Sequence, residues 1–135
     1  MQKKLELHEA TTGAQHRNNA SDYITGFTLV WGVNAYVPKS MEPTDPYLSP
    51  RQHPFSTMTP LWIMVGGAEV LYDSIVDFVG RMRGMEGNRV KLYEAPNAPH
   101  DIFFMGHLLG WAQEADAGAL AAADFLKDRG LAVKS

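Results

Sequence analysis

Hydrophobic residues follow two different periods in the second half of the chain. Residues 61–65 form a continuous apolar run, LWIMV, which is too short for a helix and is typical of a strand covered on both faces in a parallel sheet. After Gly66 and Gly67, the apolar residues from Leu71 to Met82 recur every three or four positions, which predicts a helix with one apolar stripe. Residues 89–94 alternate polar and apolar side chains, and this period of two predicts a second strand.

The C-terminal part of the chain predicts one long helix. Its apolar stripe is rich in alanine, which permits close packing on a sheet, and Gly130 is its expected terminator. The stripe consists of Leu108, Ala112, Ala115, Ala119, Ala122 and Leu126. Strand, helix, strand and helix in this order predict an α/β fold with two or three parallel strands, flanking helices and right-handed crossovers.

The first half of the chain is less regular. Residues 1–19 show little hydrophobic periodicity, so we expect a loose N-terminal segment there. Ser21 or Asp22 is the expected N-cap of a helix that ends before Pro38. Six of the eight prolines fall within residues 38–60, which predicts an irregular crossover. The domain organisation expected for residues 1–135 is therefore a single segment: the loose start, a helix and Pro-rich crossover over 20–60, and a βαβα unit over 61–135.

Composition excludes several classes of function. The formal net charge of −3 offers no attraction to nucleic acid or to an anionic membrane. The absence of cysteine excludes disulfides, thiolate metal sites and a cysteine nucleophile. No run approaches the roughly 20 apolar residues that span a bilayer, and the charged N-terminus lacks the apolar core of a signal peptide. We therefore expect a cytoplasmic protein with no transmembrane segment and no nucleic-acid partner.

An acid and a histidine follow the two predicted strands. Glu69 comes directly after the Gly66-Gly67 turn, and His100 follows the second strand behind Pro96 and Pro99. Ligands of parallel sheets bind beyond the carboxyl ends of the strands, so these two side chains can face one crevice. A histidine oriented by an acid is the proton-transfer half of a hydrolase site. Two simpler interpretations stay open: Glu69 can serve only the helix dipole, and His100 can be an ordinary loop residue.

No cofactor or metal is expected. His100 and His107 lack a convincing third ligand, and no Gly-rich loop has phosphate-binding spacing. The aromatic residues Phe103, Phe104 and Trp111 are expected in the core or in the wall of an acyl pocket.

Four segments carry a resemblance to a known family: NNASDYI, DPYLSP, PLWIMVGGAEVLYDSIVDF and APHDIFFMG. In this order and spacing they resemble the C-terminal part of an α/β-hydrolase of the hormone-sensitive-lipase or carboxylesterase type, especially the fungal steryl-acetyl-hydrolase-like members. The resemblance covers residues 5–126, nearly the whole chain. It implies that Glu69 is the acid of a catalytic triad, that His100 is its base, and that Asp73 is an accessory acid.

The chain departs from that family in one large respect. Neither the oxyanion-hole motif H-G-G-G nor the nucleophile elbow G-x-S-x-G occurs in it. The resemblance therefore implies the C-terminal portion of a serine esterase or lipase, inactive alone, whose complete enzyme takes a hydrophobic ester. An N-terminal half or a second copy of the chain is the expected partner.

Two further hypotheses remain. The chain can be a non-catalytic remnant or interaction module that binds a partner through an open sheet edge, or a truncated gene product without function. A sheet of two or three strands leaves an edge and apolar side chains exposed, which favours association with another chain.

Overall fold

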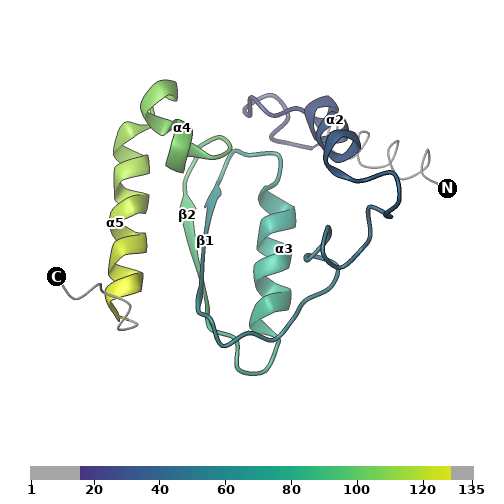
Figure 1. Ribbon diagram of the computed structural model, residues 1–135. Helices are drawn as coiled ribbons and strands as arrows, with labels where there is room; N and C mark the ends of the chain where they lie inside the picture. The colour runs from purple at the N-terminus through teal and green to yellow at the C-terminus, as the bar shows by residue number, and fades with distance from the viewer. Residues whose placement is uncertain (1–15, 129–135) are drawn as a thin grey trace.

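The computed structural model describes residues 16–128 as a small α/β unit (Figure 1). In chain order its elements are α2 (Gly26–Tyr36), β1 (Leu61–Gly66), α3 (Tyr72–Arg83), β2 (Val90–Ala95), α4 (Ile102–Leu109) and α5 (Ala112–Asp128). The two strands pair in parallel, with Leu61 opposite Val90 and Gly66 opposite Ala95. Helix α3 lies on one face of this sheet and α5 on the other. The predicted class, an α/β fold with parallel strands and flanking helices, is confirmed.

The two helix layers pack on the sheet in different ways. Helix α3 buries Val79 and Met82 almost completely, and Met82 belongs to the predicted apolar stripe. Helix α5 approaches the sheet so closely at Gly118 that a Cβ there would lie 3.0 Å from the Met64 thioether. Its buried face runs through Ala115, Gly118 and Phe125. A glycine at this contact lets the helix backbone lie nearly on the strand.

The prediction of one long C-terminal helix is wrong, because the chain is interrupted at Gly110 and forms two helices, α4 and α5. This residue has a φ of 82°, a left-handed conformation that glycine adopts without strain, and it ends α4. The expected stripe is also shifted: Leu108 is 80% exposed, and Ala119 is exposed. Helices α4 and α5 instead meet at Gly106, where a Cβ would lie only 2.7 Å from the Ala115 Cβ. The expected terminator Gly130 lies outside the described residues.

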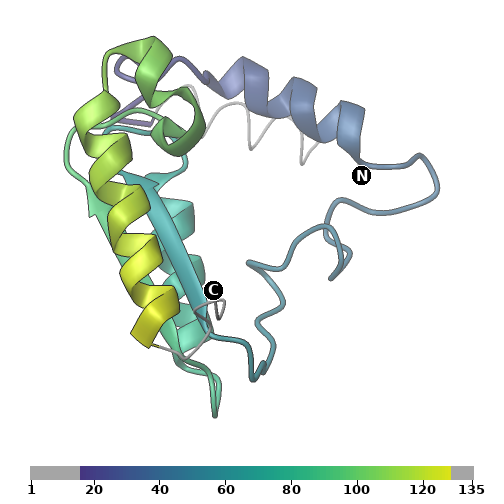
Figure 2. The ribbon, with the colours of Figure 1, turned by 60° about the vertical axis from the view of Figure 1, so that its left-hand side comes forward.

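The predicted N-cap of the first helix is also wrong. Thr25 caps α2, because its side chain accepts a hydrogen bond from the Thr28 backbone N–H. Ser21 and Asp22 lie before the cap, in a loop that reaches the carboxyl ends of the strands. Helix α2 projects away from the sheet (Figure 2) and leaves Phe27 79% exposed.

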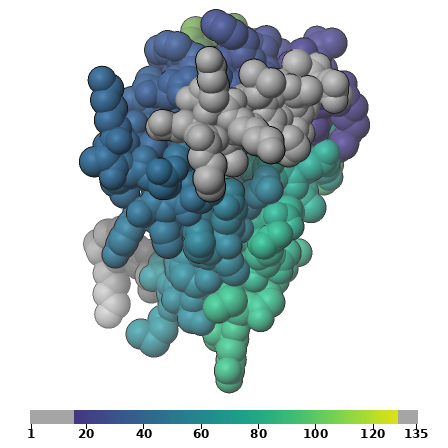
Figure 3. Space-filling view, turned by 90° about the vertical axis from the view of Figure 1, so that its right-hand side faces the viewer, coloured from purple at the N-terminus to yellow at the C-terminus, as the bar shows by residue number. Residues whose placement is uncertain are grey.

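The proline-rich segment contains no helix or strand between residues 38 and 60, as predicted. It is nevertheless attached to α3 and to the turn after it. Arg51 donates a hydrogen bond of 2.8 Å to the Ser74 hydroxyl, and the Asn88 side chain bonds the backbone of Phe55 and Thr57. Figure 3 shows this blue segment beside the teal and green surface of α3 and of the residues that lead from α3 to β2. The loose start predicted for residues 1–19 falls mostly outside the described part of the chain.

Within residues 16–128, no helix combines the length and apolar character needed to cross a membrane. Several large apolar side chains are nevertheless exposed on this part of the chain, among them Trp31, Phe104 and Leu108.

Candidate active site

Glu69 lies in the turn that joins β1 to α3. Only 3% of its side chain is exposed. One carboxylate oxygen, Oε2, accepts a hydrogen bond of 3.2 Å from the Gly66 backbone N–H, while Oε1 is buried without a hydrogen-bond partner in the described structure. A buried carboxylate oxygen without a hydrogen-bond partner is costly, which makes Glu69 a candidate for a functional role.

The turn that carries Glu69 is fastened to the turn that carries His100. The Ala68 backbone N–H donates a hydrogen bond of 2.9 Å to the Ala98 carbonyl. A Cβ at Gly66 would lie 2.5 Å from the carbonyl oxygens of both Ala98 and Pro99, closer than real Cβ contacts allow. Glycine at position 66 is therefore what lets the two turns touch.

His100 lies beside Glu69 at the carboxyl ends of the strands. Its Nδ1 atom is 3.6 Å from the Glu69 Oε2 atom, an ion-pair distance that is longer than a good hydrogen bond. Nδ1 is itself buried and lacks a hydrogen-bond partner among the described residues, whereas the side chain as a whole is 26% exposed. The exposed part of the ring therefore lies away from Nδ1. The Tyr23 ring meets the imidazole edge-on, at 6.2 Å between centroids.

The surroundings favour the protonated form of His100. Attraction between the Glu69 carboxylate and the Nδ1 proton raises the pKa of His100 above its usual 6.5, and burial of the ring opposes this shift. The negative charges of Asp22 and Asp101 raise the pKa further. A ring that gains stability on protonation is suited to accept a proton during a reaction.

Comparison with protein families shows to which family the chain belongs. The model of a family described as alpha/beta hydrolase fold matches residues 4–104, more than half of the chain and a range that includes Glu69 and His100. The chain belongs to the α/β-hydrolase fold family. No curated protein and no solved structure gives a significant match to it.

Two polar residues connect the turns of the site in this α/β-hydrolase-fold chain. The sequence alone did not assign either of them to the site. The Asn18 side chain donates hydrogen bonds to the carbonyls of Glu69 and Gly67, at 2.9 and 3.2 Å. The Asp22 carboxylate accepts from the backbone N–H groups of Val70 and His100. Both residues belong to the segment NNASDYI. The sequence alone cannot decide whether Asp22 caps a helix or serves the site, because that depends on where the loop lies.

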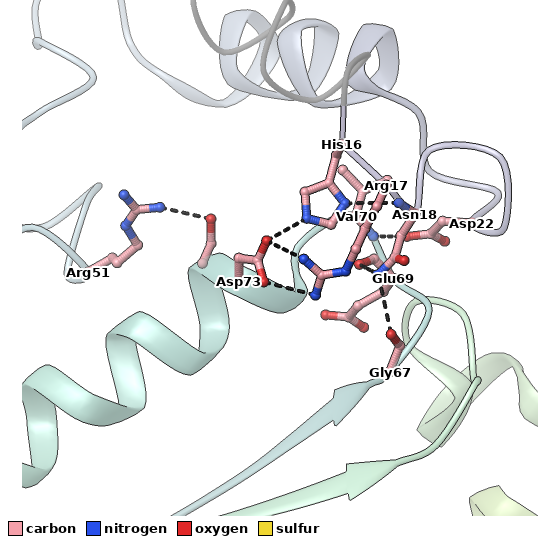
Figure 4. A network of polar contacts seen from close by, with 10 residues as sticks. His16, Arg17, Asn18, Asp22, Arg51, Gly67, Glu69, Val70 and Asp73 are labelled. Atoms are coloured by element: carbon pink, nitrogen blue, oxygen red, sulfur yellow. Dashed lines mark hydrogen bonds and ion pairs between the residues drawn. The ribbon is translucent and has the colours of Figure 1, made fainter.

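The structure places Asp73 in a separate, exposed network. Its carboxylate accepts hydrogen bonds from Arg17 at 2.8 and 3.0 Å and lies 2.9 Å from the His16 ring (Figure 4). The Arg17 guanidinium lowers the pKa of Asp73, as does His16, while partial burial opposes the shift. In this α/β-hydrolase-fold unit Asp73 therefore holds the N-terminal segment against α3, and no described hydrogen bond or ion pair joins it to Glu69 or His100.

A small pocket of about 50 Å³ borders the site on the side of α4. Its lining includes Met64, Glu69 and Asp101 together with Phe103. Phe103 is 40% exposed there, and Phe104 is 77% exposed, so the first alternative for these two rings, a place in the core, is wrong. The second alternative, the wall of an acyl pocket, stays a prediction. Trp111 packs against the buried cluster under the site, as expected. Across residues 16–128, no three acidic, histidine or cysteine side chains gather in a way that could hold a metal.

Three serines of the described segment make hydrogen bonds with groups other than His100. Ser21 donates to the Asn18 and Ala68 carbonyls, Ser49 donates to a loop carbonyl, and Ser74 accepts from Arg51. Between residues 16 and 128, no hydrogen bond joins a serine to His100. Within residues 16–128 the geometry brings Glu69 and His100 together, and no described hydrogen bond adds a serine to this pair.

Proposed function

We propose that this chain contributes the acid and the general base of a serine hydrolase that cleaves carboxylic esters. The observation that carries the proposal is the buried Glu69 carboxylate 3.6 Å from Nδ1 of the partly exposed His100. Membership of the α/β-hydrolase fold family makes hydrolysis the expected chemistry for such a pair.

The proposed roles follow from the two ends of the imidazole. Glu69 faces Nδ1, where a carboxylate fixes the ring tautomer and stabilises the imidazolium. Nε2 would then take the proton of a serine hydroxyl as that oxygen attacks the ester carbonyl. It would return the proton to the leaving alcohol when the tetrahedral intermediate collapses.

The nucleophile and the oxyanion hole are proposed to come from outside this chain. The sequence contains neither H-G-G-G nor G-x-S-x-G, and its segments resemble the C-terminal part of hormone-sensitive-lipase-type enzymes. We therefore assign the chain to the C-terminal portion of such an esterase, inactive until a complementary segment supplies the serine. We propose a hydrophobic ester as the substrate, and the partly exposed ring of Phe103 beside the site is an apolar group that such an ester could contact.

A complementation assay tests this function. The 135-residue chain is mixed with a separately produced segment that carries both missing motifs, and hydrolysis of a short nitrophenyl ester is followed. We expect turnover only in the mixture, and we expect His100→Ala to lower it at least about a thousandfold, since loss of a triad member leaves only residual catalysis. His107→Ala is the matched control, because His107 is 63% exposed and pairs with Asp116 on the surface.

Two results would sink the proposal. Unchanged turnover in His100→Ala would show that His100 is not the general base. Strong esterase activity of the purified chain alone would show that the nucleophile is within the chain.

A second candidate function is an interaction module without chemistry. The exposed side chains of Phe27, Trp31 and Leu108 favour it, because apolar surface of this kind marks sites of association. This reading predicts a stable complex with a partner chain that forms equally well with His100→Ala, and no esterase activity in that complex.

A further inference from the structure

Asp22 is a nearly buried acid in the loop that precedes α2, and only 8% of it is exposed. Its carboxylate accepts three backbone hydrogen bonds: from Ile24 at 3.3 Å, from Val70 at 2.8 Å and from His100 at 3.2 Å. Hydrogen bonds to an ionised carboxylate are roughly twice as strong as neutral ones. The acid thus ties its own loop to two other segments of the chain.

The two carboxylate oxygens of Asp22 each accept a hydrogen bond from a different turn of the site. Oδ2 holds Val70, the residue that follows Glu69 in the β1–α3 turn (Figure 4). Oδ1 holds the backbone of His100 itself, in the turn after β2. A carboxylate is rigid and planar, so the spacing between these two backbone N–H groups is set by one chemical group.

Asn18 holds the turn of Glu69 as well. Its side-chain amide donates to the carbonyls of Gly67 and Glu69, at 3.2 and 2.9 Å, so the backbone on both sides of Glu69 is held from the N-terminal loop. The Asp22 carboxylate makes no hydrogen bond to the imidazole ring, and its described bonds all go to backbone groups.

We propose that Asp22 is a positioning residue, which keeps the backbone of His100 in register with Glu69 and thereby sets the distance between the acid and the base. Its meaning for catalysis rests on the function proposed above. The positioning itself can be measured on the chain without any ester or partner segment.

A test must separate positioning from simple charge. The titratable and charged groups that face His100 are Glu69 from the β1–α3 turn, Asp22 and Tyr23 from the N-terminal loop, and Asp101 at the start of α4. The three carboxylates all favour the protonated ring, so removing Asp22 lowers the pKa of His100 whether or not it positions anything. A double-mutant cycle distinguishes the two effects, because independent charges add and a change of geometry does not.

The cycle combines Asp22→Asn with Glu69→Gln and follows the His100 imidazole by NMR titration. Glu69→Gln alone should lower the pKa of His100. In the Asp22→Asn background the same change should lower it by less than half as much, because the turns have moved apart and Glu69 already acts from a greater distance. Asp45→Asn is the matched control: Asp45 also accepts a backbone N–H, from Tyr47 at 3.0 Å, but in an exposed turn. It should leave the effect of Glu69→Gln unchanged.

An effect of Glu69→Gln that is equal in both backgrounds would overturn the proposal and leave Asp22 as a charge only. Should Asp22→Asn fail to fold, amide hydrogen exchange of the unmodified chain decides instead. The Val70 and His100 amides should exchange at least about tenfold more slowly than the Tyr47 amide after correction for intrinsic rates. Exchange as fast as that of the Tyr47 amide would also overturn the proposal.

Failure of the complementation assay, by contrast, would refute the esterase function and leave the outcomes of the titration and exchange experiments unaffected.

Discussion

Replacement of Gly66 by alanine tests the contact between the two turns most directly. The added Cβ would lie 2.5 Å from the carbonyl oxygens of Ala98 and Pro99. Carbon and oxygen atoms normally approach to about 3.3 Å, so the turns must separate by roughly 0.8 Å. Both obstacles are backbone atoms, which cannot rotate away as a flexible side chain can. The strain therefore falls on the hydrogen bond of 2.9 Å from Ala68 to Ala98.

The expected cost combines two effects. Forcing an extra methyl group into a filled space costs about 1–3 kcal/mol. Loss of one hydrogen bond between buried backbone groups adds about 1 kcal/mol. The free energy of unfolding should therefore fall by roughly 2–4 kcal/mol, a large share of the total stability of about 5–15 kcal/mol that is usual for a domain.

Urea unfolding followed by circular dichroism measures this change. Gly80→Ala is the matched control, since Gly80 is an exposed position inside α3 and a Cβ there meets no atom within 4 Å. It should stabilise the chain by about 0.5–1 kcal/mol, because alanine favours helix more than glycine does. If Gly66→Ala proves no more destabilising than Gly80→Ala, the inferred close contact between the turns does not exist in solution.

Two further predictions concern pH and the first helix. The pKa of His100 is raised on folding, so its contribution to stability is full below the usual value of 6.5 and is lost as the pH rises through the folded-state pKa. Denaturant titrations at several pH values should show this decline, and Glu69→Gln should flatten it; an equal slope in the variant would contradict the assignment. Thr25→Ala should cost about 1 kcal/mol in thermal unfolding, because the Thr28 N–H loses its cap. No measurable cost would show that α2 does not need this cap.

The regular elements could be predicted because their signals are local. The run from Leu61 to Val65 and the helical spacing up to Met82 each depend on neighbours within a few residues, and the structure has β1 and α3 at these places. The break between α4 and α5 was missed, although Gly110 is visible in the sequence. An isolated glycine inside a helical pattern is often tolerated, and only the packing of Gly106 against Ala115 requires the chain to turn there.

The site was predictable only in part for the same reason. Glu69 and His100 stand directly after strands, so parallel pairing alone brings them to one edge. The role of Asp22 depends on a contact with Val70, which is 48 positions away in the sequence. No local pattern encodes such a contact. An acid before a helix is a common capping signal, so the sequence alone favours a helix cap for Asp22.

The hydrogen bonds between the turn of Glu69 and the turn of His100 have a consequence for the order of assembly. Both turns belong to one strand-helix-strand stretch, and closing a loop of about 30 residues costs only about 3 kcal/mol of chain entropy. The turns that carry the acid and the base can therefore meet early in folding, before the loop of Asp22 docks and sets the final distance. A serine arriving from another segment would find a pair already in place, and the rate of reconstitution would be limited by docking rather than by formation of the pair.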